Sequence, residues 1–154
     1  MSLEQNKEVA RQYFEEIFNR HNFEIIEAIV AQDYVEHGAP AFQSTEPQEV
    51  DRSANGPEHM RGIAQWVLQA FPDVQFHLEH LIAEGDLVAV RSTWEGTQLG
   101  TFQSTPPTGK RFSTTRTDVL HIVDGKVVEH WANRDNLAQL LQLGILQAPQ
   151  RPQE

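Results

Sequence analysis

The stretch RFSTTRTDVLHIVDGKVVEHWANR, residues 111–134, predicts two β-strands joined by a tight turn. One strand is expected over Arg111–Val123, and the other runs from Lys126 to about Arg134. Between them lies Asp124-Gly125, a dipeptide that accepts the left-handed backbone of a two-residue hairpin loop. We therefore expect these two strands to pair with each other in an antiparallel sheet.

Two further strands are predicted before this hairpin. After Pro72 the apolar residues change from helical spacing to alternation, which begins at Val74 and predicts a strand to about Leu81. A turn at Gly85 leads into another strand over Leu87–Gln98, in which alternate residues face opposite sides of the sheet. The chain thus predicts a four-stranded meander.

Helical segments are predicted at the N-terminus. Ser2 and Gln5 have the spacing of a capping box, and apolar residues then recur every three or four positions to about Arg20. A shorter helix is expected over 23–30, after which residues 33–37 should lead into a loop.

The rest of the chain supplies a long loop and two more helices. Residues 39–55 are rich in Pro, Ser, Gln and Glu, which predicts a surface loop and a candidate lid. A helix should follow Asn55-Gly56-Pro57 and end at Pro72, and a last helix should follow Asp135.

The order of these elements predicts an α+β fold. A four-stranded sheet must twist and curl, and the N-terminal helices are free to cover one of its faces. The result is a cone-shaped, curved antiparallel sheet wrapped on N-terminal helices, with one apolar pocket at its mouth. At 154 residues the chain suits a single domain, expected over residues 1–148, with a frayed tail over 149–154.

Composition excludes several classes of partner. The formal net charge of −10 leaves no basic face to replace the counterions of phosphate, so we expect no nucleic-acid partner. No window approaches the ~20 apolar residues of a bilayer span, and the first residues lack a signal-peptide pattern, so we expect a cytoplasmic protein without a membrane partner. The absence of cysteine excludes disulfides and thiol nucleophiles.

Three charged residues, Arg91, Arg116 and Asp118, fall in the middle of predicted strands, where an unpaired buried charge is costly. Two interpretations stay open. Arg116 and Asp118, two positions apart on one strand face, form an ion pair; or Asp118 lines the pocket as a desolvated general acid or base with a raised pKa.

The seven histidines do not predict a metal site. His77 and His80 should point to opposite faces of their strand, and no helical His-x-x-x-His pair exists. His37 and His130 are better candidates for hydrogen bonding or proton transfer. Because the chain also lacks phosphate-binding and dinucleotide-binding glycine motifs, we expect neither a metal nor a cofactor.

Three segments resemble the SnoaL-like polyketide cyclases of the nuclear-transport-factor-two-like superfamily. They are PPTGKRF at 106–112, IVDGKVVEHW at 122–131 and QLG at 142–144. The resemblance implies a cone-shaped fold, cofactor-free acid/base chemistry, aldol ring closure of an aromatic polyketide, and a homodimer packed through the sheet.

The resemblance also implies where this chain departs from the family. The family's catalytic aspartate follows the position of Trp131, where this chain has Ala132, and Asp118 matches a family histidine. In the related limonene-epoxide-hydrolase type, the second strand carries Arg-x-Asp. Here Arg91 is present, but Thr93 occupies the position of the aspartate two residues later, which disfavours epoxide hydrolysis.

Three functions follow from these residues. The first is a cyclase-like enzyme acting on a hydrophobic small molecule, with Asp118 as base and His37 or His130 as helper. The others are a non-catalytic small-molecule binding protein and a protein-interaction module. Asp135, which directly precedes a helix, is favoured as its N-cap rather than as a catalytic group. The candidate substrate-binding residues are Arg91, Tyr13, Phe14, Trp66, Trp94, Trp131 and Asp135.

Overall fold

The computed structural model describes residues 1–37 and 56–150, so the predicted loop at 39–55 and the last tail residues lie outside the described residues. The helical elements are α1 (Leu3–Phe14), a π-helical turn (Glu15–Asn19), a 3₁₀ turn (Phe23–Ile25), α2 (Ile26–Ile29), α3 (Gly56–Ala70) and α4 (Asn136–Gln142). The strands are β1 (Val30–His37), β2 (Gln75–Glu84), β3 (Leu87–Thr97), β4 (Arg111–Val123) and β5 (Lys126–Arg134). The predicted α+β class is confirmed.

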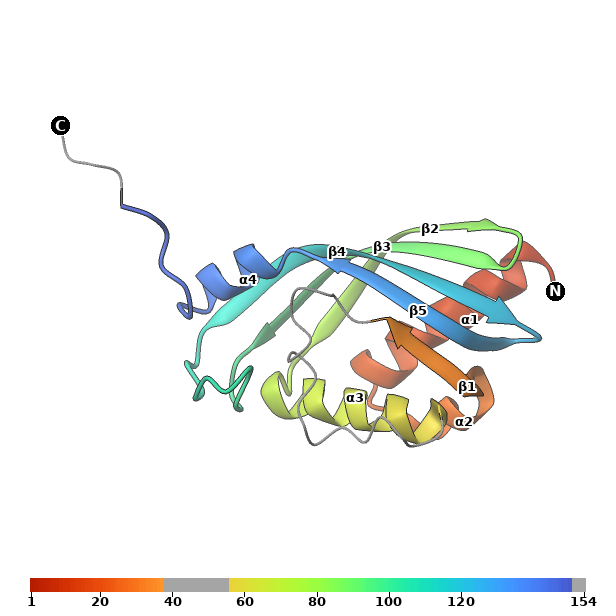
Figure 1. Ribbon diagram of the computed structural model, residues 1–154, viewed down its shortest axis with the longest axis horizontal. Coiled ribbons are helices and arrows are strands. Elements are labelled where there is room, and N and C mark those ends of the chain that lie inside the picture. The colour runs from red at the N-terminus through yellow and green to blue at the C-terminus, as the bar shows by residue number, and fades with distance from the viewer. Residues whose placement is uncertain (38–55, 151–154) are drawn as a thin grey trace.

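The strands form one curved sheet in the order β1-β5-β4-β3-β2 (Figure 1). The predicted meander β2 to β5 pairs antiparallel throughout. At the β4–β5 turn, φ is +49° at Asp124 and +77° at Gly125, as a tight hairpin loop of this kind requires. The hairpin predicted over 111–134 is therefore confirmed.

The structure adds a fifth strand, β1, where the sequence predicted the end of a helix and a loop. Strand β1 pairs parallel with β5, and its register shifts between Val30 and Val35. This irregular edge strand lacks the steady alternation of the other strands, which is why its pattern did not predict it. Its pairing brings residues 36 and 37 beside residues 130 and 131.

The concave face of the sheet arches over α1 and α3 (Figure 1). The alternation predicted for β3 is observed, since Val88, Val90, Ser92 and Trp94 are buried against the helices. Helix α1 begins at the predicted capping box, in which the Ser2 side chain accepts a hydrogen bond from the Gln5 amide.

A register shift in β2 changes one predicted orientation. The shift lies between Leu78 and His80, so His77 pairs with Thr93 and His80 with Arg91, two residues on the same face of β3. Both histidines are exposed, contrary to the expected opposite faces. Within the described residues, no group of three or more His, Cys, Asp or Glu side chains is arranged to hold a metal ion.

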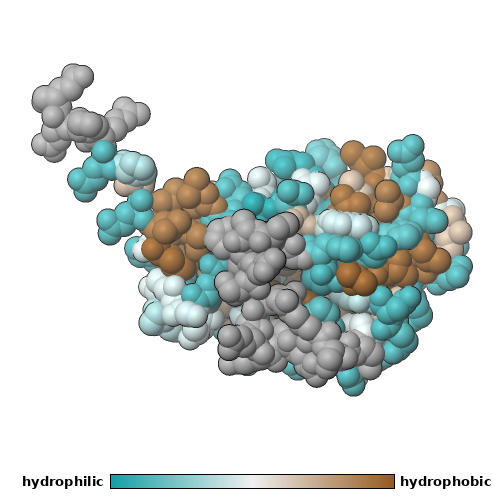
Figure 2. All heavy atoms as spheres, in the orientation of Figure 1, coloured by the Kyte–Doolittle hydropathy of each residue, from teal (hydrophilic) through white to brown (hydrophobic). Residues whose placement is uncertain are grey.

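The visible surface is mainly hydrophilic, with separate hydrophobic areas between the polar side chains (Figure 2). The exposed large apolar residues include Val35, Ile82, Leu87 and Leu137, which come from four different elements. In the described ranges, every helix is too short or too polar to cross a lipid bilayer.

Candidate active site

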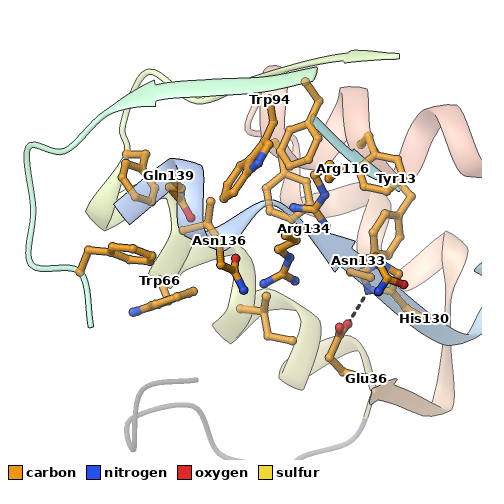
Figure 3. A pocket seen from close by; sticks show the side chains of 18 of the residues that line it. Tyr13, Glu36, Trp66, Trp94, Arg116, His130, Asn133, Arg134, Asn136 and Gln139 are labelled. Carbon is orange, nitrogen blue, oxygen red and sulfur yellow. Dashed lines mark hydrogen bonds and ion pairs between the residues drawn. The ribbon is translucent and has the colours of Figure 1, made fainter. Parts of the chain in front are cut away.

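A pocket opens between the concave face of the sheet and helices α1 and α3 (Figure 3). Aromatic side chains dominate its apolar wall, and four of the five aromatic residues predicted for substrate binding lie there: Tyr13, Phe14, Trp66 and Trp94. Their part in substrate binding stays a prediction. The charged side chains that line the pocket are Glu36, Arg116, His130 and Arg134, with His37 at its edge.

His130 on β5 is buried and lies between two carboxylates. Its Nδ1 is 2.7 Å from Glu36 Oε2, and its Nε2 is 2.8 Å from Asp118 Oδ1. Burial lowers the pKa of His130, but the two carboxylates outweigh burial and raise it to about 9. Since a carboxylate oxygen accepts hydrogen bonds, both ring nitrogens carry protons and His130 is an imidazolium at neutral pH.

Asp118 on β4 forms the ion pair that the first interpretation predicted. Arg116 Nε donates to Asp118 Oδ2 at 2.8 Å, and Arg116 Nη2 donates to Oδ1. Burial would raise the pKa of Asp118, yet the Arg116 guanidinium and the His130 imidazolium hold it well below its usual range. The side chain is 0% exposed and is absent from the pocket wall, so the predicted desolvated base with a raised pKa is a wrong description of Asp118.

The pocket wall instead contains Glu36, which lies on β1, in a segment that the sequence predicted to lead into a loop. Glu36 Oε2 receives hydrogen bonds from His130 and from the Tyr34 hydroxyl. Burial would raise its pKa, but the His130 charge and these hydrogen bonds lower it overall. Tyr34 and Glu36, two positions apart, share one face of β1, and this spacing was the signal that could have predicted a strand.

Two arginines border the same pocket in different ways. Arg116 is buried, paired with Asp118, and its guanidinium carbon lies 5.1 Å from the ring centres of both Phe76 and Trp94. Arg134, at the end of β5, is exposed and points into the cavity (Figure 3). The backbone of Arg134 belongs to the β4–β5 ladder, but its guanidinium makes no hydrogen bond or ion pair with the other described residues.

His37 and Trp131 form a separate contact at the edge of the pocket. Their rings stack with centres 4.7 Å apart, and His37 Nε2 lies 3.0 Å from Glu129 Oε2. Trp131 is absent from the pocket wall because its strand position faces away from His130. The prediction that Trp131 binds substrate in the pocket is therefore corrected. His37 borders the pocket, but its ring stacks on Trp131 and its Nε2 contacts Glu129.

Two other predicted residues also lie outside the pocket wall. Arg91 is on the outer face of β3, with its Nε 3.4 Å from Glu79 Oε2, because residues 91 and 94 alternate across the pleat. The Asp135 side chain accepts a hydrogen bond from the Ala138 amide at 3.0 Å and caps α4. Capping, the interpretation favoured for Asp135, is confirmed, and placing these two residues in the pocket is corrected.

Ala132 lines the pocket and pairs across the strands with Asp118. A methyl group thus occupies the wall at the position where the resemblance implies a carboxylate. The carboxylate that this pocket does have comes from Glu36 on the other side of β5.

Comparison with known sequences agrees with this architecture. The family model described as SnoaL-like polyketide cyclase matches residues 8–143. The aklanonic acid methyl ester cyclase DauD of Streptomyces sp. (strain C5) is 28% identical over 131 residues, which cover 84% of this chain and 76% of DauD. The aklanonic acid methyl ester cyclase DnrD of Streptomyces peucetius is 34% identical over 91 residues, which cover 58% of this chain and 62% of DnrD.

Solved structures show the same fold. TsrD from Streptomyces laurentii superposes with a TM-score of 0.79 at 24% identity, covering 95% of this chain and 99% of TsrD. IdmH from Streptomyces antibioticus superposes with a TM-score of 0.72 at 31% identity, covering 91% of this chain and 99% of IdmH. The match of the family model to residues 8–143 shows that the chain belongs to the SnoaL-like polyketide cyclase family.

Proposed function

We propose that this chain is a cofactor-free cyclase that closes a ring in an aromatic polyketide by an aldol-type step. Family membership and the names of the curated relatives support a ring closure. The observation that carries the proposal is Glu36, a carboxylate in the pocket wall that is in contact with an imidazolium. A base beside a fixed positive charge suits the formation of an enolate.

The hydrogen bonds of Glu36 define which oxygen acts. Its Oε2 receives both hydrogen bonds, from His130 and Tyr34, whereas Oε1 makes none with the described residues. In the proposed step, Oε1 takes the proton from a carbon acid, and the enolate carbon then bonds to a ketone carbon of the same molecule. The new alkoxide takes the proton back from Glu36, so substrate and product have the same atoms and charge.

The lowered pKa of Glu36 limits the substrates that it can deprotonate. A weak base suits a carbon flanked by two carbonyl groups, because both carbonyls spread the charge of the enolate. The His130 imidazolium beside the base stabilises that negative charge as it forms. Asp118 holds His130 in place from the opposite ring nitrogen and is therefore a positioning residue.

Replacing the base tests the proposal. With aklanonic acid methyl ester and the corresponding free acid as substrates, Glu36→Gln is expected to lower kcat by about 10²–10³, because the amide cannot accept the proton. The matched control is Glu129→Gln, a glutamate that pairs with His37 and His121 and is absent from the pocket wall. Its turnover should stay within about twofold of the unchanged protein, as for a surface pair.

A rescue separates the loss of a base from a loss of folding. Adding Ala132→Asp to Glu36→Gln returns a carboxylate to the pocket wall, and part of the lost turnover should return. Full activity in Glu36→Gln would refute the assignment of the base. Tight binding without conversion in the unchanged protein would instead support a non-catalytic binding protein.

A further inference from the structure

The charges around the pocket do not balance. Arg116 is paired with Asp118, and His130 lies between Asp118 and Glu36. Three cations therefore face two carboxylates, and Arg134 is the cation whose guanidinium makes no hydrogen bond or ion pair with the described residues, although the charges of Glu36 and Asp118 act on it. In Figure 3 its guanidinium projects into the cavity that a ligand would enter.

Unpaired groups in the pocket wall have the same polarity. Trp94 Nε1 and Gln139 Nε2 are buried and make no hydrogen bond with the described residues, although both residues line this cavity. Both atoms are N–H donors, as are all the nitrogens of Arg134. Buried donors without acceptors are uncommon in folded proteins, so a ligand that brings acceptor oxygens would complete this wall.

The remaining walls restrict the shape of that ligand. Trp66, Phe71 and Trp94 present ring surfaces to the cavity, and Trp66 and Phe102 lie with their ring centres 5.7 Å apart. Such walls suit a flat aromatic body. Arg134 reaches solvent, so a charged group can approach it without crossing the apolar wall.

We propose that the pocket takes a planar aromatic acid whose ionised carboxylate is held by Arg134. A guanidinium donates two parallel hydrogen bonds to a carboxylate, whose negative charge strengthens both. An ester group carries no charge and therefore binds a guanidinium more weakly. This inference rests on the proposed function for the reaction and narrows its substrate to a free acid. The curated relatives, in contrast, are named for a methyl ester.

Calorimetric titration with three probes tests the inference: anthraquinone-2-carboxylate, its methyl ester and 2-hydroxyanthraquinone. We expect the acid to bind at least about tenfold tighter than the ester. Arg134→Gln should remove this preference by weakening the acid, with ester binding unchanged. The control, Arg111→Gln, removes a guanidinium that pairs with Glu95 outside the pocket wall and should keep the preference.

Several results would overturn the inference. They are equal affinity for acid and ester, a preference that survives in Arg134→Gln, binding of the hydroxy compound as tight as that of the acid, or no binding of any probe. Because the titration needs no turnover, its failure leaves the Glu36→Gln experiment intact. Conversely, Glu36→Gln should keep the acid preference even if the proposed reaction is wrong.

Discussion

Arg91 on β3 and Arg116 on β4 show that the face of the sheet on which an arginine lies changes the energetics of its charge. Both are arginines in mid-strand and both pair with a carboxylate. The Arg91 side chain is 48% exposed on the outer face, whereas that of Arg116 is 5% exposed beside the pocket. Water screens the first pair, while the second must be satisfied within the protein.

Asp118→Asn should therefore be strongly destabilising. It leaves the buried Arg116 without its charge partner, and we expect the free energy of unfolding to fall by about 3–5 kcal/mol in urea titrations. The pKa of His130 should also fall, because Asp118 helps to raise it. If turnover requires the imidazolium, the basic limb of the kcat/KM profile should move from about pH 9 to lower pH.

The matched comparison is Glu79→Gln, which removes the partner of Arg91 on the outer face. A loss of no more than about 1 kcal/mol is expected there. Equal losses in the two variants would contradict the assignment of Asp118 to a buried network.

Strand β1 and helix α4 are short elements at opposite edges of the pocket, and each supplies part of it. Strand β1 carries Glu36 to His130 through parallel pairing with β5. Helix α4 places Gln139 in the pocket wall, and its first turn is fixed by Asp135. The geometry of the site thus depends on the ends of these elements.

Asp135→Ala tests capping against substrate binding. Loss of the hydrogen bond to the Ala138 amide should lower the free energy of unfolding by about 1 kcal/mol, with KM unchanged. Asp135→Asn keeps a capping oxygen and should cost only a few tenths of that. A rise in KM in both variants would instead show that the Asp135 carboxylate contacts substrate.

The buried network connects distant parts of the molecule. Tyr13 from α1, Glu36 from β1, Asp118 from β4 and His130 from β5 meet around one imidazolium. The pKa of Tyr13 is raised well above 10, first by burial and then by Glu36, so Tyr13 stays neutral where His130 titrates. A change in the charge of His130 therefore alters the contacts of β5 with α1, β1 and β4.

The stability of the whole protein should consequently fall in mildly alkaline solution. The pKa of His130 is about 9 in the folded protein against an ordinary 6.5, so its stabilisation is complete below pH 6.5 and is lost as pH rises through 9. Urea unfolding between pH 6 and 10 should show a loss on the order of 3 kcal/mol. His130→Gln should flatten this dependence. A flat profile in the unchanged protein would refute the charged state of His130.

Local patterns in the sequence determined the α+β class, the β2–β5 meander, the Asp124-Gly125 turn and the capping role of Asp135. They could do so because side-chain alternation, turn chemistry and helix capping involve residues close together in the chain. Of the five aromatic residues predicted for substrate binding, four lie in the pocket wall and Trp131 does not, because the packing of these side chains is not set by local patterns. Which charges meet was also decided only by the tertiary structure.

Glu36 and His130 are 94 positions apart, and their contact depends on the parallel pairing of an irregular edge strand with β5. Asp118 illustrates the same limit, since its burial was predicted but the sign of its pKa shift was not. Desolvation raises the pKa of Asp118, whereas its interactions with Arg116 and His130 lower it, and the sign of the shift depends on which effect is larger. The sequence predicted a cavity under a curved sheet, and only long-range packing decided that Glu36, rather than Asp118, is the carboxylate that faces it.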